Sequence, residues 1–166
     1  MNQNKRRLLL IQALLKEKAE YRAVNIPAEP ENQRQLLRGL MNIRAPLGLG
    51  EKILQVQDAY LQIETAAKGV TDIANLTPVQ PGLYLWQGDI TTLKCDAIVN
   101  AANSGLTGCY IPNHRCIDNA IHTFAGVELR LACAELIKSK VTRNPPGRRK
   151  NSLFGIGRWL QYPGHY

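Results

Sequence analysis

The chain has 166 residues, of which 45% are hydrophobic and 20% are charged. This length is sufficient for one ordinary domain with its own core, and the hydrophobic content excludes a wholly disordered protein. No apolar run reaches the roughly 18 residues of a membrane span, so we expect no membrane partner. The apolar run after Arg7 is interrupted by Gln12 and ends in charged residues rather than in a signal-peptide cleavage site. Four cysteines without a secretory signal favour reduced thiols or metal ligation, and we expect a cytoplasmic protein.

The net charge of +8 is unevenly distributed along the chain. All 13 acidic residues lie at or before Glu135, whereas the last 31 residues carry seven basic residues and no acidic one. A basic tail of this kind can contact phosphate backbones without sequence preference. Because the preceding part is almost neutral, we expect no nucleic-acid partner beyond such non-specific contacts.

The first 70 residues predict three helices, at 6–20, 31–44 and 51–67. Leu8, Ile11 and Leu14 recur at helical spacing in the first of them. Pro27 and Pro30 interrupt the chain before the second helix, and a Lys-Gly pair at 68–69 ends the third. This segment contains no Cys and no His. Residues 1–70 are therefore interpreted as a helical N-terminal extension that packs on the domain that follows, with binding of a partner as the other possibility.

The next elements predict an α/β arrangement. Residues 83–86 are apolar and aromatic and suit a buried strand, and residues 95–100 form a second strand that leads into a loop of small residues. A helix is predicted from Ile117 to about Lys140. Open α/β sheets bind ligands where strands end in such turns, so we expect a ligand site after residue 100.

Three potential metal ligands, Cys109, His114 and Cys116, lie within eight residues. Two thiolates and one imidazole suit Zn²⁺, and three protein ligands leave a position open for water or substrate. Cys116 directly precedes the helix predicted from Ile117, whose N-terminus favours a thiolate. The alternative is that both cysteines are small buried residues and that His114 is exposed.

The remaining cysteines and the second histidine of this region are assigned to the core. Cys95 and Cys133 lie among apolar neighbours in a predicted strand and helix. His122 shares a helix face with Asp118, four residues earlier. We interpret His122 as a hydrogen-bonded core residue, with a fourth metal ligand or a proton carrier as the alternatives.

Several motifs together resemble the macrodomain family, which binds ADP-ribose. These are GDIT at 88–91, DAIVNAAN at 96–103 and IDNAIHTFAG at 117–126. The segment GCYIPNHRC at 108–116 resembles the zinc-dependent branch, whose members are protein-ADP-ribosyl hydrolases. LLRGLMNIRAPL and ILQVQDAYLQ, at 36–47 and 53–62, are similar to the helical extension of that branch. The resemblance implies a mixed sheet flanked by helices, preceded by that extension, with Zn²⁺ as the cofactor.

The resemblance also implies roles for the polar residues before the metal motif. Asp89 corresponds to the carboxylate that contacts adenine, beside the backbone amide of Ile90. The loop of Asn100, Ala101, Ala102 and Asn103 lets the ligand approach the backbone and supplies side-chain amides. From the residues alone, Asp89 could instead cap a helix, and the two asparagines could close turns.

Two of these residues are candidates for catalysis. The resemblance places Asn103 at the distal ribose, near the bond to be cleaved, and matches Asp118 to an acidic residue that activates water. Asp118 could instead stabilise the helix N-terminus, worth roughly 0.3–1 kcal/mol. The implied activity is zinc-assisted hydrolysis of mono-ADP-ribosyl groups from modified proteins. The alternative is an ADP-ribose-binding module or an inactive fragment without turnover.

The sequence changes character after Lys138. Family members of this branch continue through further strands and a Gly-rich phosphate loop, whereas residues 139–166 are rich in basic residues, Pro and Gly. We therefore expect residues 71–138 to be the N-terminal half of a macrodomain that is incomplete at its C-terminus. Residues 139–166 are interpreted as an atypical basic tail, produced by a truncation or frameshift after about residue 138.

Overall fold

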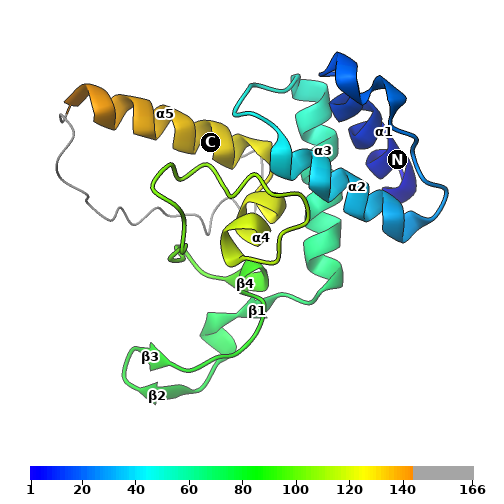
Figure 1. The fold of residues 1–166 in the computed structure, drawn as a ribbon. Helices are drawn as coiled ribbons and strands as arrows, with labels where there is room; N and C mark the ends of the chain where they lie inside the picture. The colour runs from blue at the N-terminus through cyan, green and yellow to red at the C-terminus, as the bar shows by residue number, and fades with distance from the viewer. Residues whose placement is uncertain (144–166) are drawn as a thin grey trace.

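The computed structural model describes residues 1–143, and its N-terminal part is a bundle of three helices (Figure 1). These are α1 (Gln3–Leu15), α2 (Pro30–Ile43) and α3 (Glu51–Ala67). The predictions for α2 and α3 are confirmed. The first predicted helix is shorter than expected, because α1 ends at Leu15 and a separate 3-10 turn, η1 (Ala19–Ala23), follows it.

The three helices enclose the first hydrophobic core. Leu10, Ile11 and Leu14 of α1 pack with apolar residues of α2 and with Tyr60 and Leu61 of α3. The same cluster includes Val127, which lies far along the chain at the start of α5 (Val127–Arg143). The helical N-terminal segment therefore packs on the part that follows it, as expected.

The strands of the described residues are short and form two separate two-stranded sheets. β1 (Thr71–Asp72) pairs in parallel with β4 (Leu93–Lys94), and β2 (Pro78–Gln80) pairs antiparallel with β3 (Leu83–Tyr84). Two 3-10 turns, η2 (Ile73–Asn75) and η3 (Ile90–Thr92), lie between these strands. The fold is thus mainly helical with small sheets, and a mixed sheet flanked by helices is not formed within residues 1–143.

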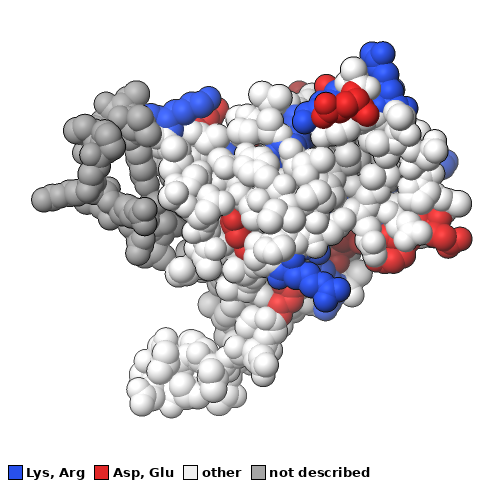
Figure 2. Space-filling model, viewed as in Figure 1, with Lys and Arg blue, Asp and Glu red and all other residues white. Residues whose placement is uncertain are grey.

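Two strand predictions are wrong in detail. The strand expected at 83–86 is limited to β3 and is exposed, with Leu85 at 83% of its maximum accessibility. The β2–β3 hairpin projects away from the helices, and Figure 2 shows it as a lobe without charged residues. The strand expected at 95–100 is reduced to a single β-bridge at Ile98, which is buried. Apolar composition identified the extended segments but not the neighbours that would bury them.

The helix expected from Ile117 to about Lys140 is two helices. α4 (Ile117–Phe124) ends at the Ala125 cap, and α5 (Val127–Arg143) starts after Gly126, whose φ is +82°. This left-handed conformation is accessible to glycine at little cost. The break places Ile121, Leu129 and other side chains in a second core.

Cys133 is buried in this second core, as predicted, and Cys95 packs at its margin. Within residues 1–143, no helix has the length and apolarity needed to cross a membrane. The predicted basic tail lies outside the described residues from position 144 onward.

Candidate functional site

The three predicted metal ligands converge in the loop that precedes α4. The ligand atoms of Cys109, His114 and Cys116 all lie within 4.8 Å of one another. The sulfur of Cys109 is 3.6 Å from Nδ1 of His114. Two sulfurs and an imidazole form a donor set that suits Zn²⁺, and the spacing is short enough for one ion. The group could therefore hold a metal ion.

The loop reaches this shape through left-handed backbone conformations. Tyr110 and Asn113 have φ values of 54° and 55°, which cost about 1 kcal/mol each for residues with a Cβ atom. Gly108 has φ +87°, and a Cβ atom there would lie 2.7 Å from the guanidinium of Arg130. The turns bring the two ends of the loop together, so that both cysteines face the same point.

Cys116 is the N-cap of α4, as its position before the helix predicted. Its sulfur accepts a hydrogen bond from the backbone N–H of Asn119 at 3.4 Å. Burial and the neighbouring Cys109 raise the pKa of Cys116. Burial also raises the pKa of Cys109, but hydrogen bonds from the Asn119 side chain and the Ile111 backbone outweigh it and lower that pKa overall.

Asn100 and Asp118, which both belong to the predicted ligand site, are brought together. Asn100 donates its amide to Oδ1 of Asp118 at 2.8 Å, and Asp118 is only 3% exposed. Nε2 of His122 lies 3.6 Å from the same oxygen. Burial lowers the pKa of His122 to about 4, although the carboxylate opposes this shift. His122 is thus a neutral core residue at pH 7, and it is not part of the metal-ligand group.

Asn103 has the turn-closing role that was the alternative to ligand binding. Its Oδ1 accepts from the N–H of Gly105 at 2.9 Å, and its Nδ2 donates to the carbonyl of Gly108 at 2.9 Å. These bonds connect the Asn-rich loop to the residue directly before Cys109. The position is exposed, so a ligand can compete for this side chain.

Asp89 caps the 3-10 turn η3, which was likewise the structural alternative. Its Oδ1 accepts from the backbone and hydroxyl of Thr91 at 2.9 and 2.7 Å, and its Oδ2 accepts from Nζ of Lys68 at 2.9 Å. Burial raises the pKa of Asp89, but these donors outweigh it and lower the pKa overall. The carboxylate remains 44% exposed and can still receive a ligand.

A groove lies beside the metal loop. Its volume is ≈ 640 Å³, and its walls come from α2, α3, α4 and the loop, including Arg38, Tyr60, Lys68, Asn113 and Phe124. Nζ of Lys68 lies 3.2 Å from the centroid of the Phe124 ring and also pairs with Asp89. Of the remaining residues of the predicted site, Ala101 is exposed, whereas Ala102 and Ile90 are half-buried.

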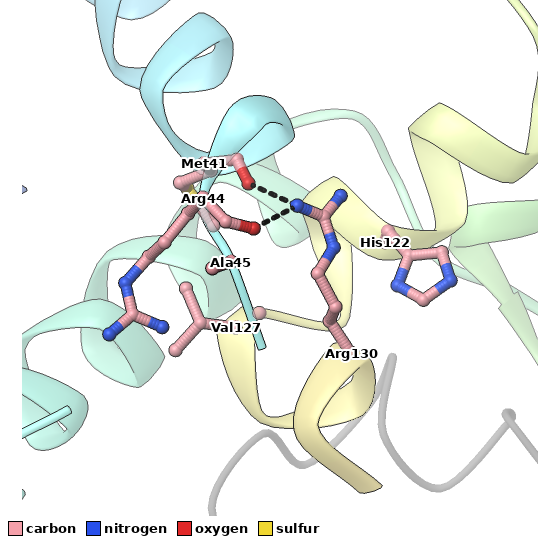
Figure 3. Close-up of a pocket in the computed structure, with 7 residues that line it drawn as sticks. Met41, Arg44, Ala45, His122, Val127 and Arg130 are labelled. Carbon is pink, nitrogen blue, oxygen red and sulfur yellow. Dashed lines mark hydrogen bonds between the residues drawn. The ribbon is translucent and has the colours of Figure 1, made fainter. Parts of the chain in front are cut away.

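Arg130 of α5 is a buried residue that the sequence analysis missed. Nη1 of Arg130 donates to the carbonyls of Met41 and Arg44 at 3.1 and 2.6 Å (Figure 3). It also donates to the carbonyl of Asn42 at 2.7 Å. Its guanidinium lies 4.4 Å from the centroid of the Tyr110 ring in the metal loop. Together with His122 it lines a small cavity of ≈ 10 Å³, about the size of one water molecule.

A signal for this burial exists in the sequence. Arg130 lies three residues after Val127 and three before Cys133, both of which are buried. It therefore occupies the apolar face of α5, where a charged side chain requires hydrogen-bond partners.

Comparisons with known proteins agree with the resemblance. Residues 99–150 match the Macro domain family. The chain is 49% identical over 154 residues to a "Protein-ADP-ribose hydrolase" of Treponema medium, which covers 90% of this chain and 59% of the relative. It is 44% identical over 168 residues to a protein of the same name from Staphylococcus aureus (strain MRSA252). That alignment covers 100% of this chain and 61% of the relative.

A "Probable bifunctional ADP-ribose hydrolase/ADP-ribosyltransferase" of Fusarium oxysporum f. sp. cubense is 40% identical over 130 residues, which covers 72% of this chain and 22% of that protein. The chain thus spans about three-fifths of the length of the two bacterial relatives. The Macro domain match runs past residue 138, where the composition of the chain changes.

Proposed function

We propose that this chain binds ADP-ribose and hydrolyses mono-ADP-ribosyl groups from modified protein side chains with the assistance of zinc. Its similarity to proteins named protein-ADP-ribose hydrolases and the Macro domain match at residues 99–150 support this proposal. The observation that carries this proposal is the convergence of the Cys109, His114 and Cys116 ligand atoms at the start of α4. The same helix turn carries Asp118, which is bonded to Asn100 of the Asn-rich loop.

The proposed ligand contacts follow the chain order of the site. Asp89 and the backbone of Ile90 receive the adenine, and the exposed fraction of the carboxylate leaves room for it. The loop of Asn100, Ala101, Ala102 and Asn103 receives the phosphates and the distal ribose. To bind there, a ligand replaces at least one of the two hydrogen bonds that Asn103 makes within its own turn.

The catalytic residues of the proposal are Asn103 and Asp118. Asn103 orients the distal ribose, and Asp118 orients the attacking water, while Asn100 fixes the position of its carboxylate. Zinc held by Cys109, His114 and Cys116 supplies a Lewis acid at this end of the site. The soft donor set and the short distances between its atoms support this ligand assignment.

A second candidate function is recognition of ADP-ribose without turnover. It is favoured by the burial of Asp118, which is 3% exposed and whose Oδ1 lies 2.8 Å from Nδ2 of Asn100 and 3.6 Å from Nε2 of His122. A carboxylate buried in this way is less accessible to a substrate water, whereas recognition of ADP-ribose does not require that access. A fragment without either activity is the third possibility.

Three finer assignments belong to the same proposal. The chain is divided into a helical extension (1–70), a macrodomain part from residue 71 to 138, and a basic tail (139–166). The shift in composition after Lys138 supports the last boundary, although the Macro domain match continues to residue 150. The parallel pairing of β1 with β4 supports a macrodomain-like mixed sheet. Four unpaired cysteines support a cytoplasmic location.

The test combines three measurements on the purified full chain. Titration calorimetry with ADP-ribose measures binding, release of ADP-ribose from a mono-ADP-ribosylated protein measures turnover, and metal analysis measures zinc. We expect binding with turnover and about one zinc per chain. Cys116→Ser should lose the zinc, whereas Cys95→Ser, which changes a cysteine outside the ligand group, should retain it.

The outcomes separate the candidates. Binding without release supports the recognition module, and loss of both activities in a folded protein refutes the proposal. Turnover that persists in a zinc-free Cys116→Ser protein would show that the metal is not required.

A further inference from the structure

Asn119 contacts both sulfurs of the metal-ligand group. Its side chain is 1% exposed, and its Nδ2 donates to Sγ of Cys109 at 3.4 Å and to the carbonyl of Ile111 at 3.0 Å. Its backbone N–H donates to Sγ of Cys116 at 3.4 Å. One residue of α4 thus connects the first and last ligands of the loop.

Arg38 of the N-terminal helix α2 determines how this amide is oriented. Nε and Nη2 of Arg38 donate to Oδ1 of Asn119 at 3.3 and 3.0 Å, and Nη2 also donates to the carbonyl of His114 at 3.1 Å. A guanidinium has only donors, so it can bond the oxygen of the amide but not its nitrogen. The nitrogen therefore faces Cys109, where a donor stabilises negative charge on the sulfur.

Asn42, one helical turn after Arg38, holds the same loop at a second point. Its Oδ1 accepts from the backbone N–H of Asn113 at 3.0 Å, and its Nδ2 donates to Oγ1 of Thr123 at 3.0 Å. Gly39 lies between them, and a Cβ atom there would come within 3.4 Å of the Asn113 side chain. One face of α2 is therefore fitted closely to the metal loop.

Arg38 and Asn119 bond directly to the metal-ligand residues, which general packing of α2 and α4 would not require. Residues that bond to metal ligands without touching the metal fix the ligand orientation and reduce the reorganisation needed for binding. A hydrogen bond with a charged donor is roughly twice as strong as one between neutral groups, so Arg38 holds the Asn119 amide firmly. Without this contact the amide can turn over and present its oxygen to the sulfur.

We propose that Arg38 and Asn119 are positioning residues of the metal centre, through which the helical N-terminal segment sets the affinity of the loop for zinc. This inference rests on the proposed binding of zinc by Cys109, His114 and Cys116. It assigns to residues 1–70 a role in the site itself, in addition to their packing with Val127 in the first core.

The test measures zinc affinity of the full chain by competition with a chromophoric chelator. We expect Arg38→Ala to weaken zinc binding by about 10- to 100-fold, the range found for groups that support metal ligands. Arg38→Lys keeps the charge but loses the forked pair of donors, so its zinc affinity should lie between those of the parent and Arg38→Ala. The matched control is Arg34→Ala, one turn earlier on α2, because Arg34 pairs with Glu31 and Glu64 instead of with the loop. It should stay within about twofold of the parent.

A second variant keeps the inference testable if Arg38→Ala does not fold. Asn119→Asp keeps the size of the side chain and the contact with Arg38 but places an oxygen opposite Cys109, so it should also weaken zinc binding about 10-fold or more. The absorption spectrum of the Co²⁺-substituted protein reports whether the ligand geometry changes with it. Circular dichroism of each variant checks that the helices remain.

The results distinguish this inference from the function on which it rests. If the parent chain takes up no zinc, both are overturned. If the parent binds zinc and folded Arg38→Ala and Asn119→Asp proteins bind it equally well, only the positioning role is overturned. Should Arg38→Ala not fold, unchanged zinc affinity in Asn119→Asp is sufficient to overturn it.

Discussion

Replacement of Arg130 tests how the two cores are joined. Arg130 of α5 is 4% exposed and donates to three carbonyls at the end of α2. Two of these carbonyls, from Met41 and Asn42, belong to the last turn of the helix and have no partner along the helix axis. Arg130→Met keeps much of the side-chain volume but leaves all three carbonyls without this donor.

The expected loss of stability is large. Each hydrogen bond to a charged donor contributes about 1.5–3 kcal/mol, but removal of the guanidinium also removes its own desolvation cost of several kcal/mol. The net change should be about 3–4 kcal/mol, compared with about 5–15 kcal/mol for the whole unfolding free energy of a typical domain. With an m-value of about 2 kcal/mol/M, the urea midpoint should fall by about 2 M.

Urea unfolding followed by circular dichroism at 222 nm measures this change. Arg22→Met is the control, because Arg22 lies exposed in η1, and it should change the midpoint by less than about 0.3 M. If Arg130→Met and Arg22→Met unfold at the same midpoint, the carbonyl contacts contribute nothing net and the reasoning fails. A single step that becomes two steps in Arg130→Met would show in addition that Arg130 couples the two cores.

Three further predictions concern the burial of Ile121, the break between α4 and α5, and the protonation of His122. Ile121→Ala should lower the free energy of unfolding by about 2–5 kcal/mol, because Ile121 is fully buried. The control, Leu85→Ala at the 83% exposed hairpin position, should lower it by less than about 0.5 kcal/mol. Urea midpoints measure both changes. Gly126→Ala should cost at least about 1 kcal/mol in the same assay, because φ is +82° and the new Cβ would lie 2.6 Å from Nε2 of Gln57; a neutral result would contradict the left-handed break between α4 and α5. Burial lowers the pKa of His122 to about 4 in the folded protein, compared with 6.5 for a free histidine. Below pH 6.5 a proton therefore binds the unfolded chain in preference to the folded one, and the free energy of unfolding decreases as the pH drops. Its contribution should make the protein about 2 kcal/mol less stable at pH 5 than at pH 7.5, and His122→Gln should remove that part of the pH dependence.

The helices α2 and α3 could be predicted because their signals are local. Pro30 occupies the first turn of α2, and the Lys-Gly pair at 68–69 ends α3. Leu37, Leu40 and Met41 recur on one face of α2 and are all buried. Periodicity and end signals within one segment therefore predicted both the elements and their buried faces.

The strands and the last helices could not be predicted in this way. The β2–β3 hairpin has the apolar composition of a buried strand, but burial depends on which segments lie beside it, and Leu83 is 54% exposed. Gly126 reads as a tolerated glycine in a continuous helix, because a left-handed residue breaks the helix only when tertiary contacts favour it. Here the bond from the N–H of Val127 to Oε1 of Gln57, at 3.0 Å, replaces a helical one.

The candidate metal group follows from sequence, but its supporting residues do not. Cys109, His114 and Cys116 lie close in the chain, so a loop can bring their ligand atoms together. Arg38 is 81 residues from Asn119, and a polar side chain on an amphipathic helix is usually solvated. No pattern within α2 indicates that Arg38 bonds to a loop residue so far along the chain.

The metal loop is held from two sides by arginines of different helices. Arg38 of α2 bonds to the carbonyl of His114 at one end, and Arg130 of α5 lies against the ring of Tyr110 at the other. Arg130 also bonds to the end of α2, so the loop, α2 and α5 form one connected unit. The guanidinium of Arg130 also interacts electrostatically with Cys109, and its positive charge favours a thiolate there. Packing of the two cores and the readiness of the loop to bind a metal therefore depend on the same contacts, so a change that loosens α2 weakens both.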